Sequence, residues 1–176
     1  MRPILIIPGY RNSGPGHWQS LWESNLRYAK RVQMPNWDFP HCPDWVEALD
    51  FAIREASVSM PPVLVAHDLG CITVAQWAER YQRPIHGALL VAPLDVEQLD
   101  TPGAMKEFAP IPLFALPFST HVVASSNDPC VTLEKAQEFA DAWDAVFTNL
   151  GARGHIDTAA GYGEWPRGEA FLQELM

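Results

Sequence analysis

Apolar residues along this chain gather in short runs that alternate with longer amphipathic stretches. The runs predict buried strands at 4–7, 31–34, 63–66, 85–91, 121–125 and 145–150, of which 31–34 is the weakest. Between them, apolar residues recur at helical spacing and predict helices at 17–26, from 44 past 53, through 72–79, after 132, and at about 168–175. Asp44 and Thr132 are predicted as N-caps. Strands and helices therefore alternate along the whole chain.

This alternation predicts an α/β fold with a mainly parallel sheet of about six strands. Parallel strands need right-handed crossovers, which place helices on both faces and give a three-layer sandwich. The segment 92–120 is rich in proline and apolar residues, and we expect it to form a short cover rather than a large cap domain. Residues 1–176 show no repeat or linker, so we expect a single domain.

Composition narrows the classes of partner. The formal net charge of −9 and the pI near 5.0 argue against nucleic acid and anionic membranes, since both require basic patches. Three cysteines without paired spacing argue against a disulfide framework and favour a reducing cytoplasm. No apolar run reaches the length of a membrane span, and the N-terminal run is too short for a signal peptide. The oligomeric state is left open.

Residues 62–71 carry the strongest local signal. A buried run leads into Ala66 and His67, Asp68 stands at the predicted apex, and Gly70 follows two residues later. Small residues two positions before and after an apex are typical of a nucleophile elbow, where strand and helix approach too closely for larger side chains.

Further polar residues follow the ends of later strands. Asp128 comes after the fifth predicted strand and His155 after the sixth. Because ligands bind outside the carboxyl ends of parallel strands, these residues are expected to meet Asp68 at one sheet edge. Their order along the chain, apex residue, acid and histidine, is that of the triad in α/β-hydrolase-like proteins.

Five segments together resemble the small serine hydrolases of the retinoblastoma-binding-protein-9 and YdeN type. These segments are the loop 8–19, the elbow 66–70, the turn 126–129 with Gly154-His155-Ile156, and the tail 161–168. The resemblance runs nearly end to end and implies a hydrolase of ester or amide bonds in a small molecule or peptide. The family carries serine at the apex, where this chain has Asp68.

The resemblance implies a role for each site residue. His155 would take the proton of the nucleophile and Asp128 would orient His155. The backbone N–H groups of Leu69 and Tyr10 would form the oxyanion hole, and Ser13 would line the substrate pocket. Four of these residues also have ordinary structural interpretations: His155 as a surface loop histidine, Asp128 as a turn residue before Pro129, Tyr10 as a loop aromatic and Ser13 as a turn hydroxyl.

Asp68 admits three interpretations. In the first, Asp68 is a carboxylate nucleophile that attacks saturated carbon, as in haloalkane dehalogenases and epoxide hydrolases. In the second, the nucleophile has been lost naturally, and the protein binds a ligand or a protein partner. In the third, Asp68 is an engineered replacement that silences the enzyme. A carboxylate attacks a carbonyl poorly, and the adduct would be a reactive anhydride. We therefore expect an inactive or altered site.

Other reactive side chains offer weaker signals. Cys71 is expected to be a buried core residue, and nothing beside Cys130 in the sequence would activate its thiol. His41 and Cys42 are two possible ligands, too few for a metal site. No metal and no cofactor are expected.

Overall fold

The computed structural model describes residues 2–58, 60–98 and 100–176. Its strands are β1 (Ile4–Ile7), β2 (Ala29–Arg31), β3 (Val63–His67), β4 (Gly87–Val91), β5 (Ser119–Ala124) and β6 (Val146–Asn149). Its helices are α1 (Trp18–Asn25), α2 (Cys42–Ala56), α3 (Leu69–Arg80), α4 (Gly103–Lys106), α5 (Leu133–Ala142) and α6 (Pro166–Glu174).

The strands form one six-stranded sheet in the order β2-β1-β3-β4-β5-β6, and every neighbouring pair is parallel. Each of β1, β3 and β4 is buried along its whole length, because helices cover both faces of the sheet. The expected α/β sandwich is confirmed, and all strands end at the same edge.

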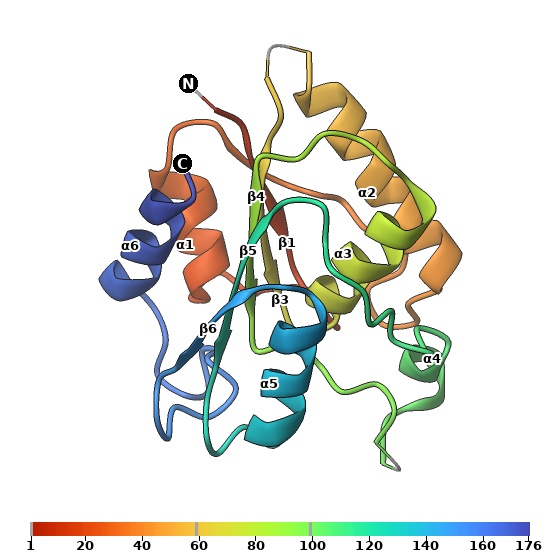
Figure 1. Cartoon of the computed structure of the whole chain (residues 1–176). Coiled ribbons are helices and arrows are strands. Elements are labelled where there is room, and N and C mark those ends of the chain that lie inside the picture. The colour runs from red at the N-terminus through yellow and green to blue at the C-terminus, as the bar shows by residue number, and fades with distance from the viewer. Residues whose placement is uncertain (1, 59, 99) are drawn as a thin grey trace.

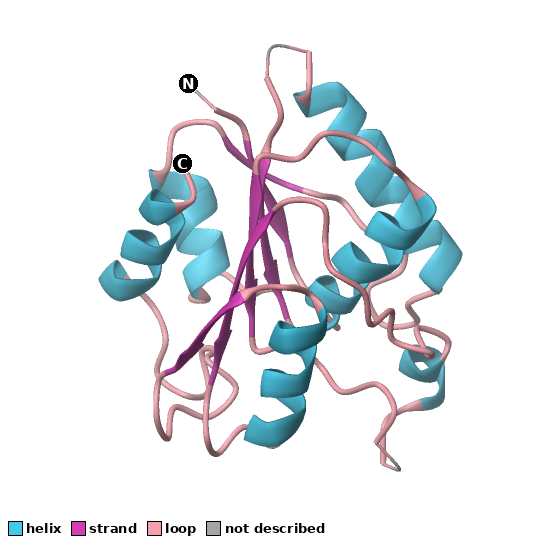
Figure 2. Ribbon diagram, viewed as in Figure 1, coloured by secondary structure: helices cyan, strands magenta, loops and turns pink. Residues whose placement is uncertain are grey.

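Two hydrophobic cores lie on opposite faces of the sheet (Figures 1 and 2). Helices α2, α3 and α5 cover one face, where Trp45, Trp77 and Trp143 are buried. Helices α1 and α6 cover the other, where Trp18 and Trp22 are fully buried. Alternate strand residues point into the two cores, as the period of two in a strand requires.

Several element boundaries differ from those expected, and the differences at the second strand and the second helix have a local cause. The second strand spans 29–31 instead of 31–34, because its neighbour β1 ends before Pro8, which has no N–H to continue the ladder. Helix α2 begins at Cys42 rather than behind an Asp44 cap, since Pro43 fits its first turn and His41 takes the N-cap position. The cap at Thr132 is confirmed, because its side chain accepts a hydrogen bond from the Lys135 N–H.

Among the described residues, the segment between β4 and β5 contains one helix, the single turn α4. Its apolar residues Leu94, Met105 and Phe108 are buried in the core shared with α2 and α3. The segment therefore covers part of the sheet edge without forming a layer of its own. Within the described residues, no helix is long and apolar enough to cross a membrane.

The first prediction concerns Gly70 in the first turn of α3. A Cβ at this position would collide with the backbone carbonyl of Ile7 and lie 2.9 Å from that of Pro8. We expect Gly70→Ala to lower the free energy of unfolding by about 2 kcal/mol, because backbone atoms cannot move aside as a flexible side chain can. Denaturant unfolding followed by circular dichroism measures the change.

Gly103→Ala is the matched control, since a Cβ there meets no atom within 4 Å. We expect the free energy of unfolding of Gly103→Ala to stay within about 0.5 kcal/mol of that of the parent. Equal stability of the two variants would contradict the close contact at the elbow.

Candidate active site

The elbow between β3 and α3 presents Asp68 at its apex. The residue has φ 54° and ψ −126°, a backbone conformation with positive φ that aspartate tolerates better than most residues. The turn after β1 lies directly against it, and a Cβ at Gly9 would collide with the Asp68 carboxylate. Glycine at position 9 thus leaves the space that the carboxylate occupies.

His155 lies between two carboxylates. Its Nδ1 is 2.9 Å from both oxygens of Asp128, and its Nε2 is 3.2 Å from Oδ1 of Asp68. Asp128 comes from the loop after β5 and its side chain is fully buried. The structure thus brings together the three residues that the sequence analysis expected at the sheet edge.

This arrangement favours the charged imidazolium form of His155. Burial lowers the pKa of the imidazole, but hydrogen bonds with Asp128, Asp68 and Cys130 outweigh burial and raise the pKa far above its ordinary value. For Asp68 the directions are reversed: burial raises the pKa of the carboxyl group, but the hydrogen bond and positive charge of His155 lower that pKa by more. The pair is an ion pair at neutral pH.

The second oxygen of Asp68 occupies the expected oxyanion hole. The Tyr10 backbone N–H donates to Oδ2 at 2.8 Å, and the Leu69 backbone N–H also stabilises the carboxylate. Asp68 is the N-cap of α3, where the helix dipole favours negative charge. The donors expected to bind a substrate oxyanion therefore bind the protein's own carboxylate.

Arg31 anchors the loop that carries Tyr10. Its guanidinium donates to Oδ1 of Asn12 and to the Ser13 carbonyl, both at 2.8 Å, and to the Ser20 hydroxyl at 2.6 Å. It also pairs with Glu23 at 2.9 Å. Because Arg31 belongs to β2, these bonds tie the loop to the sheet.

Ser13 lies beside the pocket but its side chain turns into the loop. Its hydroxyl donates to Oε1 of Gln19 at 2.7 Å and is buried. The neighbouring residues Asn12 and Gly14 line the pocket. The structure therefore assigns the Ser13 hydroxyl to the loop's internal hydrogen bonding rather than to the pocket surface.

Two buried histidines near the site, His17 and His67, were not proposed as site residues by the sequence analysis. Burial lowers the pKa of His67 well below its ordinary value, so the ring is neutral and its Nε2–H donates to the His155 carbonyl at 2.9 Å. Burial lowers the pKa of His17 to about 4. The sequence signal that could have identified His67 as a residue near the site was its position, one residue before the predicted apex. The rings of His17 and His155 lie 4.9 and 4.8 Å from that of His67.

A pocket of about 340 Å³ opens above Asp68 and His155. Among the described residues, one group of three offers ligand atoms within 4.8 Å of one another: Asp128, Cys130 and His155. A metal ion there would have to displace the proton between His155 and Asp128. The donor set therefore does not match a preformed metal site.

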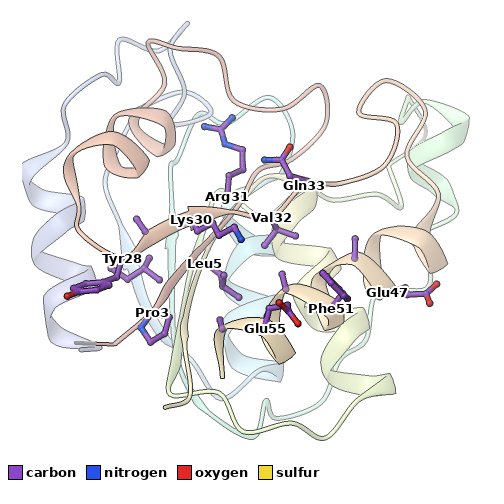
Figure 3. Close-up of a pocket in the computed structure, with 15 residues that line it drawn as sticks. Pro3, Leu5, Tyr28, Lys30, Arg31, Val32, Gln33, Glu47, Phe51 and Glu55 are labelled. Carbon is purple, nitrogen blue, oxygen red and sulfur yellow. The ribbon is translucent and has the colours of Figure 1, made fainter. Parts of the chain in front are cut away.

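A larger groove of about 690 Å³ lies away from these residues, between β2 and the outer face of α2 (Figure 3). Its walls are mostly apolar, and its lining also includes the polar or charged side chains of Lys30, Arg31, Gln33, Glu47 and Glu55. The residues lining it include no histidine, cysteine, serine or aspartate. We therefore place the candidate active site in the smaller pocket.

Comparison with known proteins finds similar chains over nearly the whole length of this one. YdeN of Bacillus subtilis is 27% identical over 177 residues, covering 94% of this chain and 91% of YdeN. The crystal structure of a YdeN-like hydrolase from Pectobacterium atrosepticum is 31% identical, with a TM-score of 0.86 over 99% of this chain and 90% of that one. The B. subtilis YdeN structure has a TM-score of 0.81 at 24% identity, covering 99% and 98% of the two chains.

The fold extends to more distant proteins. Est1E from Butyrivibrio proteoclasticus is 11% identical, with a TM-score of 0.72 over 99% of this chain and 88% of that one, a likeness of fold alone. A model of the serine hydrolase family matches residues 4–174, nearly the whole chain. The chain therefore belongs to the serine hydrolase family.

Proposed function

We propose that this chain is a catalytically silent member of its family that binds a small ligand in the pocket above Asp68. One observation supports this above all: the Asp68 carboxylate accepts the Tyr10 N–H with one oxygen and faces His155 Nε2 with the other. Both the oxyanion hole and the general base are therefore engaged by the residue that replaces the nucleophile.

The chemistry of acyl transfer supports the same proposal. A general base must be neutral to accept a proton, whereas each ring nitrogen of His155 faces a carboxylate and the raised pKa favours the protonated ring. A substrate carbonyl would also have to displace Oδ2 of Asp68 from the Tyr10 N–H before its oxyanion could be stabilised. Both obstacles arise from the same carboxylate.

The positions of the other residues expected to act in hydrolysis support the same proposal. Asp128 faces Nδ1 of His155, and the elbow backbone presents its apex residue toward Nε2. A serine at position 68 would bring a hydroxyl to His155 and release the two backbone donors. Hydrolysis of an ester or amide, the reaction that the family resemblance implies, is thus latent in the fold.

Attack by Asp68 on saturated carbon is a second candidate function. The bond between Oδ2 and the Tyr10 N–H would stabilise the ester carbonyl formed by such an attack. The following step requires neutral His155 to activate water, and both ring nitrogens face carboxylates. The silent interpretation is therefore favoured.

We also propose a reducing compartment for the protein, in agreement with the cytoplasmic location expected from composition. Cys42, Cys71 and Cys130 are all free thiols in the structure.

The second prediction tests the silent site with Asp68→Ser. We expect the parent protein to hydrolyse p-nitrophenyl butyrate little faster than buffer, and Asp68→Ser to raise the rate by about 10²-fold or more, because a nucleophile is restored and the base is freed. Release of p-nitrophenol measures the rate.

Asp68→Ala is the matched control, since it removes the carboxylate without adding a hydroxyl, and it should remain inactive. Robust hydrolysis by the parent, or equal activity in the parent and Asp68→Ser, would show that the apex residue is not the nucleophile. Incubating the parent with 1-bromobutane and measuring its intact mass tests attack on saturated carbon, because an alkyl ester on Asp68 would reveal it.

The third prediction concerns the protonation of His155. A carboxylate on each side stabilises the charged form, so removing one of them lowers the pKa. We expect the His155 ring signals of the parent to stay those of imidazolium through neutral pH. In Asp68→Ser we expect the pKa of His155 to be lower, so that its ring signals titrate at lower pH than in the parent. NMR of the ring nitrogens measures both. A His155 pKa that is unchanged by the substitution, or higher in Asp68→Ser, would contradict the ion pair.

A further inference from the structure

Among the described residues that line the pocket above Asp68 and His155, negatively charged side chains outnumber positively charged ones. Two carboxylates, Asp68 and Asp157, lie in its wall, and the lining includes no lysine or arginine. We infer that this pocket selects a small organic ammonium ion, with Asp157 as the residue that binds its positive charge. This inference rests on the proposed binding function and names the class of ligand.

Asp157 follows the candidate histidine by two residues and is half-buried at the pocket wall. Its Oδ1 accepts the N–H of Ala160 at 2.9 Å, which holds the carboxylate in the turn after His155. Among the described residues its Oδ2 has no hydrogen-bond partner, so one oxygen is available to a ligand. Its charge also acts on the His17 imidazole across the pocket, where it opposes the effect of burial on the pKa.

The charges around the pocket sum to a negative value. The charge of His155 balances only one of its two flanking carboxylates, Asp68 and Asp128. The excess carboxylate and Asp157 together leave about two negative charges, since His17 and His67 are neutral. A carboxylate ligand would be repelled by this field, and an ammonium ion attracted to it.

The charge of Arg31 reaches the pocket and lowers the pKa of His17, but the Arg31 guanidinium is paired with the Glu23 carboxylate at 2.9 Å, so the pair adds little net charge. Arg11 lies beside Tyr10, but its guanidinium is 3.7 Å from Asp38, and the side chains of this pair are 71% and 70% exposed. It is therefore a solvated surface pair. Such exposed pairs have little effect at a distance because water and salt screen them.

The remaining lining limits the size of the ligand. Leu94, Met105 and Ala159 supply apolar wall, and the volume of about 340 Å³ lies near the lower end of small-molecule sites. A primary ammonium on a short alkyl chain satisfies both features, with its charge at Asp157 and its chain against the apolar wall.

The fourth prediction tests this class of ligand with three probes that share a four-carbon chain. We expect n-butylammonium to bind the parent protein more tightly than 1-butanol, and butyrate to bind weakest. Asp157→Asn keeps an oxygen for the Ala160 N–H and removes the charge, and should weaken n-butylammonium binding about fivefold while leaving 1-butanol unchanged. Backbone amide shifts in NMR titrations measure all affinities.

Glu47→Gln is the matched control, because it removes one exposed negative charge that lines the other groove. It should leave the three affinities unchanged, whereas raising the salt concentration should narrow the difference between n-butylammonium and butyrate. Absence of n-butylammonium binding, equal binding of butyrate, or unchanged selectivity in Asp157→Asn would each overturn the inference. These measurements use the parent chain, so they stand apart from whether Asp68→Ser gains esterase activity.

Discussion

The contact between the turn after β1 and the elbow after β3 is the constraint on which the site depends. Gly9 and Gly70 have no side chains at this contact, and a Cβ on either would collide with the opposing segment. The backbone of the first turn can therefore approach Asp68 closely enough for the Tyr10 N–H to reach its carboxylate at 2.8 Å. Arg31 holds the same turn from the neighbouring strand, so the donor is positioned before any ligand binds.

A carboxylate at the apex changes the site because it differs from a hydroxyl in charge and in number of oxygens. One oxygen engages the backbone donor, and the other engages His155. A neutral hydroxyl could not fill both positions, nor would it stabilise an imidazolium. At the position where a serine would meet His155, the Asp68 carboxylate therefore forms an ion pair with a defined geometry. Asp128 holds the opposite nitrogen of the His155 ring.

The surroundings make this ion pair part of the protein's structure. His67 is neutral and donates to the His155 carbonyl, which fixes the loop that carries the imidazole. The carboxyl group of Asp128 is fully buried and also accepts the Cys130 N–H at 2.8 Å. A buried charge needs such partners to offset its desolvation, and here each charged group has them.

The sequence by itself predicted the fold class, the elbow and the meeting of Asp68, Asp128 and His155 at one sheet edge, because strand periodicity and the common edge of parallel strands place residues that follow strands together. It could not show that the Asp68 carboxylate accepts the Tyr10 N–H, since this depends on a side-chain conformation and on a contact across 58 positions. The direction of the Ser13 hydroxyl and the place of Asp157 in the pocket wall were likewise decided by tertiary structure. Local pattern fixes which face of an element a residue lies on, whereas packing between distant segments decides which atoms meet.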